Sequence, residues 1–348
     1  MFKVQTMLAA VFALALPAGA LAAAADAPEG YRLSEPIVHG NLAIYFVHGT
    51  SRGGPVPLTL QEALARKVIE VRETGKVNEL EIENTGDDEI FIQGGEIVKG
   101  GKQDRVLPMS LVVPPHSGNL AVSAYCVEAG RWTQRGAEDA QKFTTAAASV
   151  PSRSAKLDLA ATAAAPPVTG GSAIGTTQQR IWDGVKRIQG KLSNNVGAAV
   201  ASPRSQSSLQ LSLENGQLAR EQAAYVDALE RRGLEADDIV GYVFAINGKM
   251  NSADIYSSNG LFKKLWPKLL RASVTEAIGE KDAAAEPTPQ RAAAAGFLTS
   301  LNGRRTVESD AGRTATVRKR ETNAAVFTET RPAAAAPSAW VHRNYLAR

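Results

Sequence analysis

The sequence predicts an α+β protein in which an antiparallel β-sandwich-like N-terminal half precedes a helix-rich α/β C-terminal half. Three observations carry this prediction. Up to residue 143, short apolar or alternating runs are separated by turn residues, which is typical of antiparallel strands. Beyond residue 178, apolar residues recur at helical spacing around one apolar strand pattern. Between the two, 144–177 is rich in Ala, Ser, Pro, Thr and Gly and poor in large apolar side chains, so it is expected to be an exposed loop or linker.

Strands and one short helix account for the first half. The helix is predicted over 59–66, because Pro57 and Thr59 form a start signal and Thr is a favourable N-cap. The turn residues of 84–88, which read NTGDD, lie between two strand patterns and predict a hairpin. The predicted strands are 42–47, 68–71, 79–83, 89–93, 106–113 and 120–127.

Helices dominate the second half. Apolar residues at helical spacing predict helices over 178–192 and 217–232. The apolar run 239–246 predicts a strand, followed by a turn at Asn247-Gly248. A further helix is predicted over 261–278, where Pro267 implies a kink or a later start.

The first residues have the features of a secretory signal peptide. Lys3 precedes an apolar run over 7–16 that is too short to span a bilayer, and small residues lead up to Ala22. We therefore expect a protein exported to the periplasm or secreted, with cleavage near Ala22 and no membrane span afterwards. The expected organisation is 1–22 signal peptide, 23–143 β-rich half, 144–177 low-complexity loop or linker, and 178–348 an α+β half packed on the first.

Charge does not point to a nucleic-acid partner. The chain has 39 Lys and Arg against 35 Asp and Glu, and the cations are spread out rather than arranged in a stripe. The partner is expected to be a small molecule or a protein segment of unknown identity, and no cofactor can be named.

The densest group of chemically active residues lies between Gln93 and Trp132, which reads QGGEIVKGGKQDRVLPMSLVVPPHSGNLAVSAYCVEAGRW. Glycines and polar side chains between short strands are typical of a binding or catalytic surface at strand ends. A phosphate-binding loop is excluded, because Glu96 stands where that motif requires glycine and Gln103 follows its lysine. The candidate ligand-binding residues are Lys99, Gly100, Gly101, Gln103, Arg105, Arg131 and Trp132.

Other familiar sites have little support in the sequence. The four histidines, His39, His48, His116 and His342, show no ligand spacing, so each is expected to be a surface or packed residue and no metal site is predicted. A metal site assembled from distant residues stays an open alternative. No serine lies in a Gly-x-Ser-x-Gly motif.

Cys126 is the only cysteine and cannot form a disulfide within the chain. It is expected to be a small buried hydrophobic residue, with a functional thiol or an intermolecular disulfide as alternatives. On a strand, Glu128 would point to the same face as Cys126. An ion pair of Glu128 with Arg131 is the favoured interpretation of those two residues, and Trp132 is expected to anchor a core.

The segments GGEIVKGGKQDR, VVPPHSG and YCVEAGRW resemble the ARG and Rhodanese-Phosphatase-superfamily-associated Protein domain family, where ARG stands for ADP-ribosylglycohydrolase. The similarity extends through Trp182 and 244–258 to WVHRNYL near the end. By gene association, the resemblance implies a role near ADP-ribose or phosphate chemistry. The family's motif positions in this chain are Gly94, Glu96, Lys99, Gly100, Gly101, Gln103, Arg105, Cys126, Glu128, Gly130, Arg131 and Trp132.

Two functions follow as expectations. The favoured one is a periplasmic binding or interaction module for a small anionic or sugar-like ligand, or for a protein segment. The alternative is a hydrolase or transferase that uses Cys126 as nucleophile, or Glu96 or Glu128 as general acid/base. A third interpretation is that the glycines only build tight sheet corners.

Overall fold

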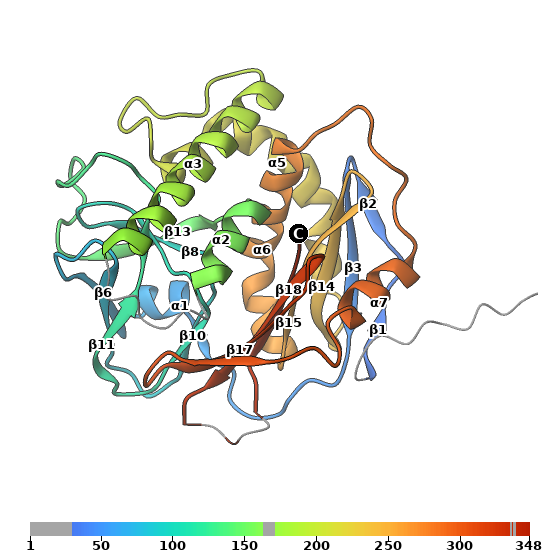
Figure 1. Ribbon diagram of the computed structural model, residues 1–348, viewed down its shortest axis with the longest axis horizontal. Helices are drawn as coiled ribbons and strands as arrows, with labels where there is room; N and C mark the ends of the chain where they lie inside the picture. The colour runs from blue at the N-terminus through green and yellow to red at the C-terminus, as the bar shows by residue number, and fades with distance from the viewer. Residues whose placement is uncertain (1–29, 163–170, 335, 337–338) are drawn as a thin grey trace, which may run out of the picture.

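The computed structural model describes residues 30–162, 171–334, 336 and 339–348, and the predicted signal peptide lies outside them. The α+β class is confirmed, since antiparallel sheets and separate helices make up the fold (Figure 1).

Among the described residues, the largest sheet has nine strands in the order β1-β3-β14-β15-β19-β18-β17-β16, with β2 also paired to β3. It therefore combines strands from both predicted halves of the chain. All strand pairings of this sheet within the described residues are antiparallel. Its strands are β1 (Arg32–Leu33), β2 (Ile37–His39), β3 (Leu42–His48), β14 (Ile239–Ile246), β15 (Lys249–Tyr256), β16 (Val307–Asp310), β17 (Ala315–Glu321), β18 (Ala325–Pro332) and β19 (His342–Ala347).

Both faces of the main sheet are buried at β14, whose alternating side chains enter two different cores. On β14, Tyr242 and Phe244 pack into the core that contains Trp266 of α6 (Asn259–Gly279). The intervening Val243 packs into the core that contains Leu298 of α7 (Arg291–Thr299). Figure 1 shows α6 on one side of the main sheet and α7 on the other.

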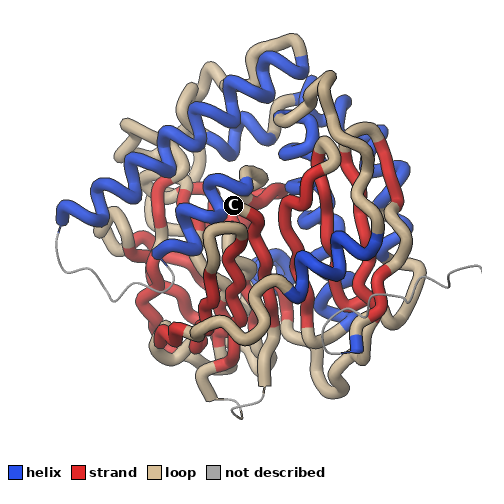
Figure 2. The backbone as a smooth tube through the Cα atoms, turned by 45° about the vertical axis from the view of Figure 1, so that its right-hand side comes forward, coloured by secondary structure: helices blue, strands red, loops and turns tan. Residues whose placement is uncertain are grey.

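Further helices cover the α6 side of the main sheet. Figure 2 shows the long helix α3 lying across the top of the molecule. The predicted cap of the first helix is present, since Glu62 N–H donates to Thr59 Oγ1 and Thr59 N–H donates to Glu62 Oε2. The remaining helices are α1 (Leu60–Ala65), α2 (Arg153–Thr162), α3 (Gly171–Val196), α4 (Leu209–Leu213), α5 (Gly216–Leu229) and the 3₁₀ turn η2 (Arg231–Gly233).

Three smaller sheets are formed by the described residues of the first half: β10-β7-β4, β11-β6-β5 and β12-β9-β8-β13. They share a separate apolar core that includes Leu80, Ile82 and Leu120. Their strands are β4 (Leu58–Thr59), β5 (Ile69–Glu73), β6 (Glu79–Asn84), β7 (Ile90–Ile92), β8 (Glu96–Gly100), β9 (Arg105–Val106), β10 (Leu111–Val113), β11 (Gly118–Ser123), β12 (Tyr125–Cys126) and β13 (Phe143–Ser149).

The predicted hairpin around 84–88 is wrong. β6 pairs with β5 and β11, whereas β7 pairs with β10 and β4, so the turn leads from one sheet to another. Asn84 holds this crossover, because its side-chain amide donates to the carbonyl oxygens of Asp88 and Pro114 at 2.8 and 3.0 Å. Turn-forming residues marked a change of direction, but they do not specify which strands pair.

Two other segments differ from expectation. The segment 144–177, expected to be a loop, contains most of β13, all of α2 and the start of α3. The small residues of this segment are sufficient to form regular structure, because β13 pairs with β8 and Ala155 of α2 packs into the core. Pro267 lies inside α6, so the helix does not start late.

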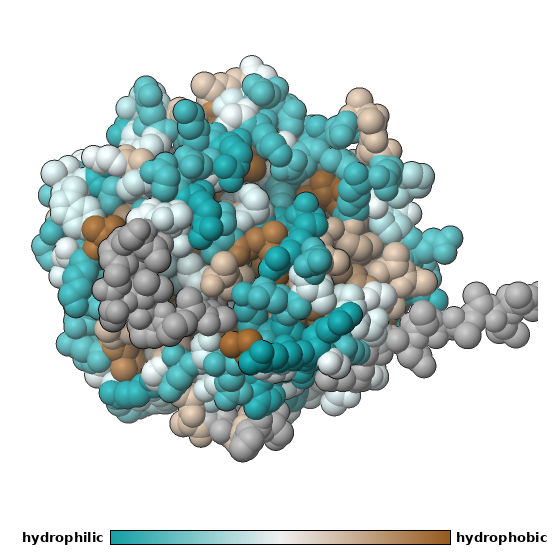
Figure 3. Space-filling model, viewed as in Figure 1, coloured by the Kyte–Doolittle hydropathy of each residue, from teal (hydrophilic) through white to brown (hydrophobic). Residues whose placement is uncertain are grey.

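Outside the grey atoms, the face in Figure 3 is mainly hydrophilic, with small separate apolar patches. In the described part of the chain, no helix combines the length and apolar character that a membrane span requires.

Candidate functional site

The predicted block 93–132 extends over the strands β8 to β12 and the loop that follows β12. At its centre is a buried ionic network, in which the side chains of Asp104 and Glu128 are fully buried. Arg135 donates to both oxygens of Asp104 at 2.8 and 3.0 Å and to Glu128 at 3.4 Å. The expected ion pair between Arg131 and Glu128 is present at 2.7 Å.

Glu128 stays charged within this network. Burial disfavours its carboxylate, but hydrogen bonds from Arg131 and Ser205 and the charge of Arg135 outweigh burial and lower its pKa. An acid/base catalyst needs a pKa near the working pH and access to substrate. Glu128 has neither property, so its surroundings favour a structural role.

The other predicted binding residues are largely engaged with the protein itself. Lys99 binds Glu214 at 2.8 Å, and the Gln103 amide donates to the Glu128 carbonyl oxygen at 2.9 Å. Arg105 is fully buried and donates to the Gln103 carbonyl oxygen at 2.8 Å. The expectation that Trp132 anchors a core is wrong, because its side chain is exposed, and Lys102 and Arg105 lie over its ring at 5.2 and 5.4 Å.

Gly100 and Gly101 form a tight corner at the end of β8. A Cβ on Gly101 would lie 2.2 Å from Cζ of Phe143, and one on Gly100 would lie 2.8 Å from the Lys142 carbonyl oxygen. These contacts support the interpretation that the glycines build sheet corners. Glu96 is engaged elsewhere, since it forms a buried ion pair with Lys268 and accepts a hydrogen bond from Thr145.

Cys126 has the surroundings of a packed residue. Its side chain is fully buried, and its backbone N–H and C=O both bond to the Gln178 amide at 2.9 and 2.8 Å. Burial raises the pKa of its thiol to about 11. The thiolate is the nucleophilic form, so these features disfavour catalysis by Cys126.

Native protein is therefore expected to react very slowly with iodoacetamide. With a pKa of about 11, roughly one thiol in a thousand is ionised at pH 8, and that thiol is not accessible. Mass spectrometry should find one alkylated cysteine only after denaturation. Native labelling as fast as that of free cysteine would restore the nucleophile hypothesis.

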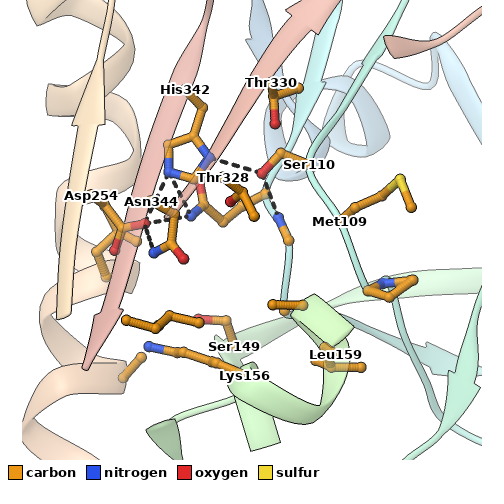
Figure 4. Close-up of a pocket in the computed structure, with 18 of the residues that line it drawn as sticks. Met109, Ser110, Ser149, Lys156, Leu159, Asp254, Thr328, Thr330, His342 and Asn344 are labelled. Atoms are coloured by element: carbon orange, nitrogen blue, oxygen red, sulfur yellow. Dashed lines mark hydrogen bonds and ion pairs between the residues drawn. The ribbon is translucent and has the colours of Figure 1, made fainter. Parts of the chain in front are cut away.

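A second group of polar residues lies where the main sheet meets the smaller sheets. Ser110 precedes β10, Asp254 lies on β15, and His342 begins β19. The antiparallel register pairs Asp254 with Asn344 and Tyr256 with His342, which places these side chains on neighbouring strands. Figure 4 shows Ser110, His342 and Asp254 joined by hydrogen bonds at the wall of a cavity.

The hydrogen bonds define a Ser–His–Asp relay. Ser110 Oγ lies 3.0 Å from His342 Nδ1, and His342 Nε2 lies 2.9 Å from Asp254 Oδ1. A carboxylate only accepts, so Nε2 carries the imidazole proton and Nδ1 accepts from the Ser110 hydroxyl. Ser110 Oγ in turn accepts from the Gly94 N–H at 2.9 Å. All three side chains are almost fully buried.

Surrounding groups fix the relay in place. The His342 ring stacks on Tyr256, with ring centroids 4.8 Å apart and planes at 18°. Asn344 donates to Asp254 Oδ1 at 2.9 Å, and the Gln93 amide donates to the same oxygen at 3.3 Å. The Gln93 amide is oriented by Tyr256, whose hydroxyl donates to Gln93 Oε1 at 2.8 Å.

Asp254 is held in its charged form. Burial opposes this, but the hydrogen bond and charge of His342, the charge of Lys156 and the Asn344 hydrogen bond outweigh burial and lower its pKa. The backbone also approaches closely here, because a Cβ on Gly94 would lie 3.1 Å from the Ser110 nitrogen. Gly94 therefore allows its own N–H to reach Ser110.

The cavity next to the relay has a volume of about 60 Å³. Space of this kind holds roughly four to six water-sized groups. Opposite the relay, Lys156 and Ser149 form part of the lining, and Thr328 and Thr330 add hydroxyl groups (Figure 4). Within the described residues, no group of three or more His, Cys, Asp or Glu side chains is arranged to hold a metal ion.

Sequence reasoning missed Ser110, Asp254 and Lys156 and treated His342 as one of four scattered histidines. One feature of the sequence did point to this site: Gln93, Gly94 and Ser110 lie within the block 93–132, which also contains the predicted binding residues. No spacing could have joined Ser110 to His342, because they meet only where one of the smaller sheets packs against the main sheet.

These features define a class of protein: an α+β protein with a small polar cavity between its main sheet and its smaller sheets. The chain belongs to the family described as the ARG and Rhodanese-Phosphatase-superfamily-associated Protein domain, whose model matches residues 30–346. The resemblance found in the sequence is thus confirmed. Comparison with curated proteins and with solved structures gave no significant match.

Proposed function

We propose that this chain is an exported binding protein whose cavity takes a small ligand with an anionic group. Export is proposed from the signal-peptide pattern of 1–22. The observation that carries the binding proposal is Lys156, a half-buried lysine that lines the cavity. Among the described residues, Lys156 forms no direct ion pair: its ammonium lies over the Phe244 ring at 6.0 Å. Its charge acts on the carboxylates of Asp254 and Glu276 without contact, so an anion in the cavity would give Lys156 a direct partner.

The rest of the lining supports an oxygen-rich ligand. Ser149, Thr328 and Thr330 offer hydroxyl groups that donate or accept hydrogen bonds. Asp254, the acidic residue of the lining, is already engaged by His342 and Asn344 and would repel an anion less than a free carboxylate. The small volume fits a carboxylate, a phosphate or a short acyl group.

We expect acetate or inorganic phosphate to raise the melting temperature of the wild-type protein, with sodium chloride at equal ionic strength as the control. The Lys156→Met variant should bind at least about tenfold more weakly in calorimetric titration, because a hydrogen bond to a charged group is lost. Lys186→Met is the matched control, since Lys186 is exposed on α3 and does not line the cavity.

The predicted site around Lys99 is tested in the same titration with Lys99→Ala. Loss of binding in Lys99→Ala, with full binding in Lys156→Met, would move the site back to the sequence-predicted block. Absence of any response to either anion in the wild type would end the binding proposal for this ligand class.

The second candidate function is hydrolysis or group transfer. The arrangement of Cys126, Glu96 and Glu128 gives it little support, since each is buried and engaged in other contacts. The Ser110–His342–Asp254 geometry is the specific observation that favours it.

A further inference from the structure

We infer that Ser110, His342 and Asp254 form a catalytic relay that hydrolyses a small ester, with Ser110 as the nucleophile. A nucleophilic hydroxyl requires a base within hydrogen-bond reach and a third group that orients the base. Ser110 lies 3.0 Å from His342 Nδ1, and Asp254 lies 2.9 Å from Nε2. The inference rests on the proposed function in one respect, because the substrate must enter the same cavity.

The proton positions suit this chemistry. The Nε2 proton is directed at Asp254, which leaves the lone pair of Nδ1 directed at the Ser110 hydroxyl. Serine hydrolases commonly use Nε2 for this task, but either nitrogen of imidazole is a competent base when the other is protonated. The Gly94 N–H on Ser110 Oγ stabilises negative charge on that oxygen as its proton leaves.

The relay is also preorganised. Stacking on Tyr256 and the contacts of Asp254 with Asn344 and Gln93 hold the imidazole before any substrate binds. The charged carboxylate of Asp254 stabilises the imidazolium that forms when His342 accepts a proton. Any buried histidine needs hydrogen-bond partners at its ring nitrogens. The feature specific to a relay is that the partner of Nδ1 is a serine hydroxyl that also lines the cavity.

The reaction balances with water as the only co-substrate. Ser110 Oγ forms a bond to the carbonyl carbon of the ester while its proton passes to His342 Nδ1. The bond from that carbon to the alkoxy oxygen then breaks, and the leaving alcohol takes the proton from Nδ1. Water attacks the acyl-serine, gives a proton to Nδ1, and releases the acid as Ser110 recovers its proton.

The cavity lining limits the substrate class. A volume of about 60 Å³ admits a short acyl group. Lys156, on the opposite side of the cavity, supplies positive charge for the oxyanion of the tetrahedral intermediate and for the carboxylate product (Figure 4). The anion of the proposed function is then the product of this reaction.

The test uses methanesulfonyl fluoride, a small reagent that sulfonylates activated serines with loss of fluoride, and phenyl acetate as the ester. We expect one sulfonyl group per chain, located on Ser110 by peptide mass spectrometry, and phenyl acetate hydrolysis that the reagent abolishes. Ser110→Ala should lose both reactions. His342→Gln should lower both rates by roughly 10²- to 10⁴-fold, since it removes the base.

Ser123→Ala is the matched control, because Ser123 is exposed on β11 and does not line the cavity, and it should retain sulfonylation at Ser110. Thermal unfolding establishes that each variant is folded, and Asp254→Asn replaces His342→Gln if the latter does not fold. Sulfonylation elsewhere, unchanged rates in the folded base variant, or no reaction with either reagent would overturn the inference. Acetate titration of the wild type separates the two proposals: acetate binding without sulfonylation or turnover removes catalysis alone, whereas turnover without acetate binding removes the proposed function alone.

Discussion

Replacing Arg135 with methionine is expected to lower the free energy of unfolding by roughly 3–5 kcal/mol. Arg135 is 4% exposed and pairs with Asp104 and Glu128, whose side chains are fully buried. Without the guanidinium, the buried negative charges of Asp104 and Glu128 are no longer fully neutralised. The free-energy cost of leaving these charges buried is larger than the net stabilisation that the ion pairs supply. Urea unfolding monitored by tryptophan fluorescence gives the measurement.

The control is Arg231→Met, which removes an arginine that is 88% exposed and should change stability by less than about 0.5 kcal/mol. The pH dependence adds a second readout. The folded-state pKa of Glu128 lies below its ordinary 4.5, so the stabilisation is present above pH 4.5 and is lost as the pH falls through the folded value. The difference between wild type and Arg135→Met should therefore narrow in acid, and equal stability at neutral pH would contradict the structural role of the network.

Replacing Gly101 with alanine is expected to be the second most damaging change. Gly101 has φ of +56°, and its new Cβ would lie 2.2 Å from the buried ring of Phe143. The left-handed backbone costs alanine about 1–2 kcal/mol, and moving the ring adds roughly 1–3 kcal/mol. Thermal and urea unfolding should both report the loss.

Gly118→Ala separates the two contributions, because Gly118 has φ of +59° with nothing near the position of its Cβ. It should show only the backbone cost. A Gly101→Ala variant as stable as Gly118→Ala would mean that Phe143 moves aside freely, and the corner would then not depend on close packing.

Local features of the fold were predictable from the sequence. The capping residue Thr59 located α1, and the apolar runs located β3 and β14. These signals depend on neighbouring residues, so one sequence is sufficient to find them. The pairing of strands depends on contacts between distant residues, and for this reason the turn after β6 predicted a hairpin that does not form.

The candidate site was predictable only in part. The block 93–132 was identified for its glycines and charges, and those charges are paired mainly with charged residues outside the block, such as Glu214, Lys268 and Arg135. Six other residues of the block line the cavity: Gln93, Gly94, Gly95, Pro108, Met109 and Ser110. Their partners on β15 and β19 follow from sheet register, which residue types alone do not reveal. The assignment of binding to Lys99, Gln103 and their neighbours stays a prediction.

The position of β19 between β15 and β18 has a consequence for how the molecule folds. Strand β3 also pairs with β14, across the whole region that forms the smaller sheets. Such non-local pairings make folding slow, because long loops must close before the contacts form. His342 meets Asp254 and Ser110 only after this central pairing is complete. In an incompletely folded chain, Ser110 therefore lacks its contact with His342, and the relay that we infer exists only once the sheet has closed.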